Sequence, residues 1–361
     1  MVTNKEQNKL NVPHLRFPEF QGEWEKCKLG DIAEFSTARV SSAKLDCKNY
    51  VSTENMLQDF QGVVEAKSVP NDTNVISFTC GDILISNIRP YLKKVWKATF
   101  DGGCSSDVFV LHATDTVAKD YLHYAVANDK FINYVMSGAK GVKMPRGDKN
   151  QMRTYQLSLP SIQEQHKIAK LLTLLDERIA TQSKLIEDLK KLKSAIIETS
   201  FLSEFSKKME YFSPTIISGK DKNTDGSYPL YGSTGKIGTV STPSYTTPMV
   251  LVARVGSIGT VQYINEPCGV TDNTLILQGD DVEYIYYFLS GFNFKKIISG
   301  TTQPLITASS LKAIDVPILN GHKKKALLAI LKSLDKKINL ESLVENEQRK
   351  LKLYILYQMF I

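Results

Sequence analysis

The chain has 361 residues, of which 42% are hydrophobic and 23% charged, and its net charge is +7 at pH 7. That length suits two ordinary domains, each able to bury a core, and the composition is that of a soluble globular protein. The sequence has no apolar run of 18 residues and its first residues are polar. We therefore expect a cytoplasmic protein without a membrane span or a signal peptide.

Residues 1–20 are expected to form an N-terminal arm and residues 21–160 a first globular domain. The five cysteines are scattered without a Cys-x-x-Cys pair, and the five histidines are equally dispersed. An odd, scattered set fits neither a disulfide framework nor a zinc site. We interpret the cysteines as reduced packing residues and expect no bound metal. The cysteines are Cys27, Cys47, Cys80, Cys104 and Cys268.

Two groups of basic residues fall in the first domain. One is interleaved with Tyr91 and Trp96 and consists of Arg89, Lys93, Lys94 and Lys97. The other lies in residues 140–153, where three turn-forming residues predict a loop, and consists of Lys140, Lys143, Arg146, Lys149 and Arg153. Exposed lysine and arginine near aromatic rings are typical of phosphate contact combined with base reading. An ordinary solvated basic surface would give the same pattern.

Residues 161–205 are predicted to form one long helix, the central spacer. Its apolar residues recur in steps of three and four, with charged residues between them. Pro160 precedes it, Ser161 is the expected N-cap, and Glu164 would complete a capping box. A helix of about 60 Å, at 1.5 Å per residue, needs a partner that covers its narrow apolar seam.

Residues 206–319 are expected to form a second globular domain. The stretch "YPLYGSTGKIGTV" (228–240) is not a phosphate-binding loop, because Leu230 replaces the first glycine and Ile237 follows the lysine. We interpret the glycines here as turns between strands. Gln can bond adenine bidentately, and Thr can contact a base or a thymine methyl group. The candidate DNA contacts of this domain are Lys236, Arg254, Ser257, Thr301, Thr302 and Gln303.

Residues 320–361 are predicted to form a distal spacer helix, with Asn320 as its expected cap. Residues 327–361 match residues 168–202 without a gap at an offset of 159. The shared pattern favours two helices packed on each other, but it does not set their direction, and each helix could instead lie on its own domain. The expected packing residues are Leu172, Leu175, Ile179, Leu192, Ile196, Leu331, Leu334, Ile338, Leu351 and Ile355.

The duplication extends into the globular stretches. The segment "GDILISNIRP" (81–90) corresponds to "PMVLVARVGS" (248–257), and "VMSGAKGVKMPRG" (135–147) to "IISGTTQPLITAS" (297–309). The expected class is α+β, with two globular α/β domains alternating with two long helices. The sequence has no G-x-S-x-G, no H-E-x-x-H and no recognisable Cys–His pair. A duplicated domain without catalytic signatures indicates a binding protein.

The whole layout resembles the specificity subunit of Type I restriction-modification enzymes. The segment "LRFPEFQGEWEKCKLGDIAEF" (15–35) is similar to the start of a recognition domain in that family. The family's Pro-x-x-x-Glu-Gln-x-x-Ile helix start is present as Pro160, Glu164, Gln165 and Ile168. Two features depart from the family: the second domain lacks the opening that Trp24, Leu29 and Gly30 supply in the first, and the second helix start lacks the Glu-Gln pair.

This resemblance implies two target-recognition domains joined by two spacer helices that pair as an antiparallel coiled coil. It implies a non-catalytic subunit that reads a bipartite, asymmetric site on double-stranded DNA. The implied partners are two modification (methyltransferase) subunits and restriction/translocase subunits. S-adenosylmethionine, ATP and magnesium would bind to those partners and no cofactor to this chain. The alternatives are a fused enzyme, for which an N-P-P-Y or D-P-P-Y motif is missing, and a protein-binding adaptor.

Overall fold

The computed structural model of the protein describes residues 11–300 and 303–360. The chain divides into two compact units, Met1–Thr181 with Glu345–Ile361, and Gln182–Val344. Two long helices, α5 (Ile162–Ser200) and α9 (Gly321–Met359), contribute a segment to each unit. Candidates Thr301 and Thr302 lie outside the described residues.

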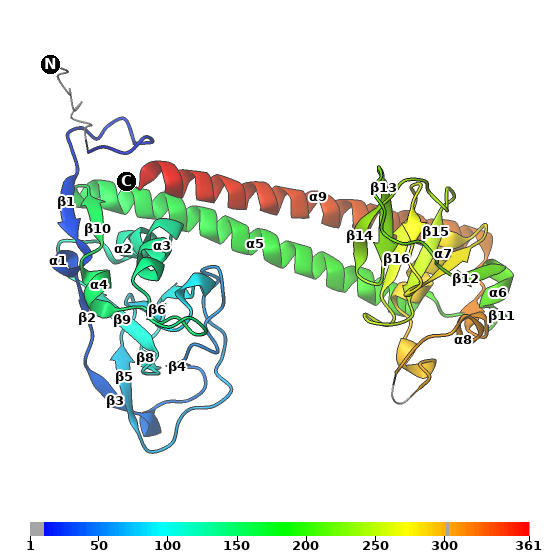
Figure 1. The fold of residues 1–361 in the computed structure, drawn as a ribbon, viewed down its shortest axis with the longest axis horizontal. Helices are drawn as coiled ribbons and strands as arrows, with labels where there is room; N and C mark the ends of the chain where they lie inside the picture. Colours follow the sequence, from blue (N-terminus) through cyan, green and yellow to red (C-terminus); the bar gives the residue numbers. More distant parts are fainter. Residues whose placement is uncertain (1–10, 301–302, 361) are drawn as a thin grey trace. The chain divides into compact units, whose positions relative to one another are not determined.

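The first unit contains a β1-β10 strand pair, a sheet with the strand order β2-β9-β6-β7, and a sheet with the order β3-β5-β8-β4 (Figure 1). Its strands are β1 Glu25–Lys28, β2 Ala33–Phe35, β3 Arg39–Ser41, β4 Tyr50–Val51, β5 Asn74–Phe78, β6 Ile83–Ser86, β7 Val95–Lys97, β8 Gly102–Cys104, β9 Val108–Ala113 and β10 Gln156–Leu159. Its shorter helices are α1 Leu29–Ile32, η1 Ser42–Lys44, η2 Pro90–Leu92, α2 Lys119–Val126, α3 Asp129–Ser137 and α4 Lys149–Arg153.

The second unit contains a β11-β19 strand pair, a sheet with the order β12-β18-β15-β16, and a sheet with the order β14-β13-β17. Its strands are β11 Ser206–Lys208, β12 Thr215–Ser218, β13 Tyr228–Gly232, β14 Gly235–Val240, β15 Met249–Ala253, β16 Val261–Ile264, β17 Gly269–Val270, β18 Thr274–Gln278 and β19 Asp315–Pro317. Its shorter helices are α6 Met209–Phe212, α7 Val282–Ser290, η3 Phe294–Lys296 and α8 Ala308–Lys312.

The two units repeat one topology. Strand β6 lies antiparallel between β9 and β7, and β15 lies antiparallel between β18 and β16. A short parallel pair also recurs, as β4 with β8 and as β13 with β17. Both central strands, "ILIS" and "MVLVA", are buried on both faces, and all their residues except Ser86 are apolar. The predicted α+β class with an internal duplication is confirmed.

The opening that the second domain lacks in sequence is present in its structure. Leu29 begins α1 directly after β1 and is fully buried, and its amide donates to Tyr155 O. Met209 begins α6 directly after β11, is equally buried, and donates in the same way to Ile314 O. A methionine therefore occupies the apolar position that leucine fills in the first unit.

In each unit a pair of tyrosines on one helix attaches the globular part to the long helices. Tyr121 on α2 donates to Ser158 O and stacks on Phe360, with ring centroids 5.2 Å apart. Tyr284 on α7 donates to Pro317 O, and its ring centroid also lies 5.2 Å from that of Phe201. One turn further along, Tyr124 and Tyr287 donate to aspartates on the long helices. Sequence analysis missed this repeated Tyr-x-x-Tyr, although "YLHY" and "YIYY" are both visible in the sequence.

Helices α5 and α9 run antiparallel in both units. In the first unit Lys352 of α9 contacts Asp176 of α5, and in the second unit Lys193 of α5 contacts Asp335 of α9. Since the residue numbers rise on one helix as they fall on the other, the direction that the sequence pattern left open is antiparallel. Buried positions on the pair include Leu172, Ile179, Ile186, Ile197, Leu331, Ile338, Ile355 and Leu356. Leu175, Ile196 and Leu334 are half-buried.

Two of the expected packing residues do not lie in the seam. Leu192 is 50% exposed and its counterpart Leu351 is 48% exposed, so that assignment is wrong for both. At this turn the half-buried side chains are Lys193 and Lys352. Lysine can fill such a position because its aliphatic stem packs while its ammonium group reaches a polar partner.

At the start of α5, Glu164 and Gln165 each bind another part of the first unit. Glu164 does not complete a capping box, because its carboxylate is paired with the Arg16 guanidinium at 2.8 and 2.9 Å. This ion pair raises the pKa of Arg16. Gln165 accepts from the Ala118 amide at 2.8 Å, at the N-cap of α2.

In the second unit Lys324 stands at the position of Gln165 and binds the side chain of Asp281, the N-cap of α7, at 2.6 Å. The sequence departure is therefore a substitution of one helix-start contact by another.

Among the described residues, no helix is long and apolar enough to cross a membrane. The same residues contain no group of three or more His, Cys, Asp or Glu side chains arranged to hold a metal ion. All five cysteines are free, and Cys104 and Cys268 are buried. Burial raises the pKa of the Cys104 thiol to about 12.

Candidate nucleic-acid interface

A short hairpin, residues 140–146, projects from the first unit. Lys140 and Arg146 exchange both backbone hydrogen bonds, at 3.0 and 2.9 Å. Gly141 has φ +93°, a conformation that other residues rarely adopt, and Pro145 is buried at the base of the hairpin. The Pro145 carbonyl accepts from the Arg89 amide at 2.8 Å, which fixes the hairpin to the chain that follows β6.

The second unit repeats the base of this hairpin at Ser299, Gly300 and Leu305. Ser299 and Leu305 exchange backbone hydrogen bonds at 3.0 and 2.9 Å, and Gly300 has φ +88°. Both hairpins are anchored in the same way, because Gly147 N donates to Asn87 O and Ile306 N donates to Arg254 O. At the offset of 159 that relates the long helices, "KGVKMPR" is therefore equivalent to "SGTTQPL".

This equivalence corrects the sequence alignment. Matching "SG" with "SG" placed Gly138 opposite Gly300, whereas Gly141 is the residue with the matching positive φ. After each hairpin a capped helix begins: Asp148 accepts from the amides of Asn150 and Gln151 at the start of α4, and Thr307 accepts from Ser310 at the start of α8. The caps fix where the hairpin ends.

Only part of the basic set at 140–153 faces solvent. Lys140, Lys143 and Arg146 are exposed. Lys140 lies 3.4 Å from Asp148, and Arg146 lies 3.3 Å from Asp107, both at the surface. Lys143 makes no hydrogen bond or ion pair with any described residue. These three cations are available for phosphate contact, since exposed ion pairs are weak and exchange readily.

The other two basic residues of this segment differ in exposure: Lys149 is half-buried, whereas Arg153 is exposed. They lie on helix α4, and not in a loop as the sequence suggested. Lys149 Nζ lies 4.7 Å from the Phe109 ring centroid, and the Arg153 guanidinium lies 5.7 Å from that of Phe35. Burial, followed by the nearby Arg153 charge, lowers the pKa of Lys149. The expected loop is therefore wrong for Lys149 and Arg153, which lie on a helix, and the expected projection into solvent is wrong for Lys149.

The basic group at 89–97 is also divided. Arg89 is exposed, whereas Lys93 pairs with Asp129 at 2.8 Å and Lys97 pairs with Asp120. Lys94 Nζ donates to Thr53 O at 2.5 Å, and burial lowers its pKa. The two aromatic residues of this group separate in the same way: Tyr91 is exposed, but Trp96 is a core residue between Phe78 and Phe100.

The loop carrying Arg89 is held in an unusual backbone conformation. Arg89 and Lys93 have φ values of 49° and 54°, and on the loop beside them Asp59 and Phe60 have values of 53° and 61°. The two loops are joined by backbone hydrogen bonds from the Asp59 amide to Leu92 O and from the Phe60 amide to Lys93 O. Four non-glycine residues in the left-handed region on two adjoining loops are costly, and such strain gathers at functional sites.

In the second unit, Arg254 and Ser257 follow strand β15, and Arg254 O accepts from the Ile306 amide at the base of the 299–305 hairpin. Arg254 is half-buried and donates to Ser218 Oγ at 3.3 Å, and Ser257 is exposed. Lys236 is exposed on β14, and Gln303 is exposed on the hairpin. The structure therefore brings Arg254 to the base of this hairpin, as it brings Arg89 to the base of the hairpin in the first unit.

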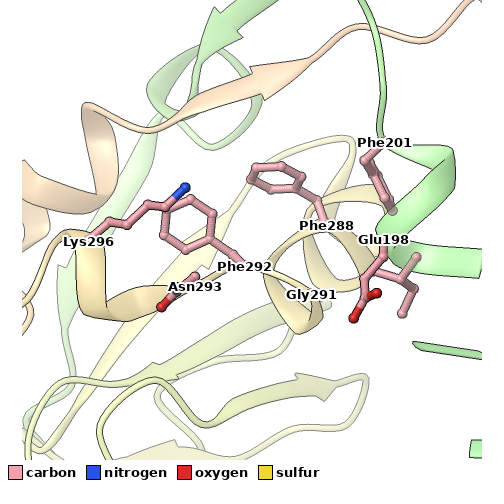
Figure 2. A pocket seen from close by; sticks show the side chains of 8 residues that line it. Glu198, Phe201, Phe288, Gly291, Phe292, Asn293 and Lys296 are labelled. Carbon is pink, nitrogen blue, oxygen red and sulfur yellow. The ribbon is translucent and has the colours of Figure 1, made fainter. Parts of the chain in front are cut away.

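The second unit also has a pocket of about 220 Å³ that no predicted residue lines (Figure 2). Phe288 and Phe292 lie between Glu198 and Lys296 in this view, and Phe201 closes one side. At the counterpart of Glu198 the first unit has Tyr357, whose ring lies 5.5 Å from Lys130 Nζ. The pocket therefore lies at a position where the two units differ in chemistry.

Comparison with known proteins gave consistent matches. A family model for the Type I restriction modification DNA specificity domain matches twice, over residues 21–191 and 197–348. The specificity subunit of the Escherichia coli Type I restriction enzyme EcoDI is 23% identical over 226 residues, which cover 60% of this chain and 50% of that protein. The MjaVIII specificity subunit of Methanocaldococcus jannaschii is 24% identical over an alignment of 416 positions, which covers 96% of this chain and 94% of that protein. The chain thus spans half of the first relative and nearly all of the second.

Two solved structures share the fold. The S subunit of a Type I restriction-modification system from M. genitalium superposes with a TM-score of 0.65 at 16% identity, covering 97% of this chain and 99% of that one. A chain from a study of complex assembly and conformational transition in a type I R-M system superposes with a TM-score of 0.57 at 18% identity, covering 92% and 96%.

Proposed function

The chain belongs to the family of Type I restriction-modification DNA specificity subunits, and from that premise we propose that it reads a bipartite, asymmetric site on double-stranded DNA. Each unit would read one half-site. The chain itself would carry out no catalysis, and its role would be to direct the activity of partner subunits.

The observation that carries this proposal is the repeated hairpin. The bases of the two hairpins, Lys140 with Arg146 and Ser299 with Leu305, have the same backbone hydrogen bonds, followed in both cases by a positive-φ glycine and, further along the sequence, by a proline at the equivalent position. The side chains between glycine and proline differ, being Val142, Lys143 and Met144 in one and Thr301, Thr302 and Gln303 in the other. One scaffold with two sets of side chains supports two half-sites of unlike sequence, because base identity is read by side chains at the groove edges.

We propose two modification (methyltransferase) subunits, and restriction/translocase subunits with them, as protein partners. Leu192 and Leu351 occupy equivalent positions on the two long helices, and both are about half exposed. Equivalent exposed apolar positions on two antiparallel helices support docking of two copies of one partner. S-adenosylmethionine, ATP and magnesium would then be bound by those partners.

The test is selection of duplexes by the full-length protein from a random library, at two salt concentrations. We expect enrichment of one split motif with a fixed gap and unlike halves, and the same motif in the methylome of a host that carries the protein with its modification subunit. Retention of duplex without any sequence enrichment would contradict the proposal.

We also propose that the helix pair fixes the gap between the half-sites. Seven residues inserted after Lys184 in α5, together with seven after its counterpart Leu343 in α9, would lengthen the pair by about 10 Å, or about three base pairs. We expect a gap about three base pairs longer and unchanged half-sites. The matched control is the insertion in α5 alone, which shifts the register and should abolish specific binding. An unchanged gap in the double insertion would refute this role.

A further inference from the structure

The 140–146 hairpin carries two exposed apolar side chains among three exposed cations. Val142 is fully exposed, and Met144 is 46% exposed. Lys140, Lys143 and Arg146, all exposed, surround them in the sequence. Of all the large apolar side chains in the described residues of this segment, only these two extend into water; Met152, a few residues further on, is fully buried.

The backbone holds this hairpin in place. Gly141 supplies a positive φ that a side chain would strain, and a Cβ there would come within 3.2 Å of Met144 O. Pro145 is fixed by its own ring and by the hydrogen bond that its carbonyl accepts from Arg89 N. Because the hairpin is constrained at both ends, it can present Val142 and Met144 without a large loss of conformational freedom on binding.

The three cations of the hairpin indicate what class of molecule it binds. Three cations in seven residues favour a polyanion, and duplex DNA is the polyanion that the proposed function supplies. For Val142 and Met144 to be buried on binding, the DNA must offer an apolar group near the phosphates that the cations bind. On the base edges of the major groove that group is the thymine 5-methyl.

We infer that Val142 and Met144 contact thymine methyl groups in the half-site read by the first unit, while the surrounding cations bind phosphates. This inference rests on the proposed function and adds base identity to it. The equivalent residue before the proline in the second unit is Gln303, which is polar, so the two half-sites would differ in their need for thymine methyls.

The experiment uses the full chain and the duplex selected as its site. Thymines in one half-site at a time are replaced by deoxyuridine, which pairs with adenine in the same way and lacks only the methyl group. Binding is measured by fluorescence anisotropy. We expect the affinity to fall about fourfold per contacted methyl, the factor that corresponds to one buried methyl or methylene group, in one half-site only.

A matched variant, Val142→Ser with Met144→Gln, removes both apolar side chains and keeps all three cations. We expect it to bind the thymine duplex more weakly, to bind thymine and deoxyuridine duplexes equally, and to keep the salt dependence of the parent. Because both positions are exposed, its thermal midpoint should be unchanged. If deoxyuridine lowers the affinity of the parent in neither half-site, or if the variant still prefers thymine, the inference is overturned. Failure of the proposed function would look different, since no duplex would then be selected over random competitor.

Discussion

Asp176 on α5 accepts a hydrogen bond from Lys352 on α9, with 2.5 Å between Oδ1 and Nζ. Tyr124 donates to the other oxygen of the same carboxylate at 2.9 Å. The second unit repeats the arrangement, with Asp335 bound by Lys193 at 2.5 Å and by Tyr287 at 2.9 Å. Each carboxylate therefore joins both long helices to the globular part of its own unit.

These triads explain why the helices pair in one register. Moving one helix by a turn would leave a half-buried carboxylate and a lysine without partners, and unpaired charges of this kind oppose wrong registers more than they strengthen the right one. Near the middle of the pair, Gln182 donates to the carboxylate of Glu341 at 2.6 Å. Those two residues are 159 apart, so a residue meets its own counterpart, as a two-fold relation between the helices requires.

A double-mutant cycle on Asp176 and Lys352 should give a coupling free energy of about 1 kcal/mol, because the pair is only partly exposed and is shared with Tyr124. The cycle on Asp335 and Lys193 should agree within error. Urea unfolding provides the measurement. The matched control is the fully exposed pair Glu187–Lys191, for which we expect no measurable coupling. Equal coupling in all three pairs would contradict the role assigned to the triads.

Leu172→Ala should cost about 3 kcal/mol of unfolding free energy, because Leu172 is fully buried. Its counterpart Leu331 is equally buried and should respond alike. Leu192→Ala and Leu351→Ala should cost under about 0.5 kcal/mol, since both side chains are half exposed. Thermal and urea unfolding of the four variants test the corrected seam, and a large loss in Leu192→Ala would restore the original assignment.

The sequence predicted both long helices to within a few residues, because their apolar periodicity is local and strong. It did not separate Leu192 from the seam, because Leu189, Leu192 and Ile196 all fit a helical stripe, while the seam residue Lys193 reads as polar. For the same reason, the run of basic residues in the sequence did not reveal that Lys149 packs over Phe109. Whether a lysine packs or projects depends on which strands lie beneath it, and a single sequence does not contain that information.

The free energy of unfolding should fall on acidification, and His123 should be one cause. Its Nδ1 is buried and has no hydrogen-bond partner among the described residues, and burial, with Lys352 and Lys97 nearby, lowers the pKa of His123 to about 4. An unfolded histidine titrates near 6.5, so below that pH the unfolded chain binds the proton first. The contribution is therefore fully present above pH 6.5 and is lost as the pH falls towards 4, by about 2 kcal/mol at pH 5.

The matched variant is His123→Tyr, because Tyr286 stands at the equivalent position beside Tyr287. It should lose that part of the difference between the urea midpoints at pH 7 and pH 5. If the urea midpoints of the variant at pH 7 and pH 5 differ by as much as those of the parent, His123 does not cause the difference.

Lys143 and Lys149 should separate DNA contact from packing. Lys143→Ala should weaken binding to all duplexes alike and reduce the slope of log affinity against log salt by about 0.9, as expected for one phosphate contact. Lys149→Ala should leave the slope unchanged and lower the unfolding free energy by about 1 kcal/mol, through loss of its packing on Phe109 and Phe35. Titrations at several salt concentrations, with urea unfolding alongside, distinguish the two. An unchanged slope in Lys143→Ala would remove the hairpin from the interface.

The first half of the chain, residues 1–205, should pair with a second copy of itself. At the offset of 159, Lys193 is the counterpart of Lys352, and Phe201 is the counterpart of Phe360, which stacks on Tyr121. A second copy therefore offers an equivalent residue at each of these contacts. An antiparallel homodimer should form, with Asp176 of each copy bound by Lys193 of the other.

Charge reversal makes this test specific. Asp176→Lys puts two like charges at both contacts and should yield monomer in sedimentation equilibrium, since the same residue occurs twice in a symmetric dimer. Adding Lys193→Asp restores opposite charges at both contacts and should restore the dimer, whereas Glu187→Lys on the exposed face should change nothing. A half-chain that stays monomeric at tens of micromolar, or a reversal that the second substitution fails to rescue, would mean that these lysine–aspartate contacts do not determine how the helices pair.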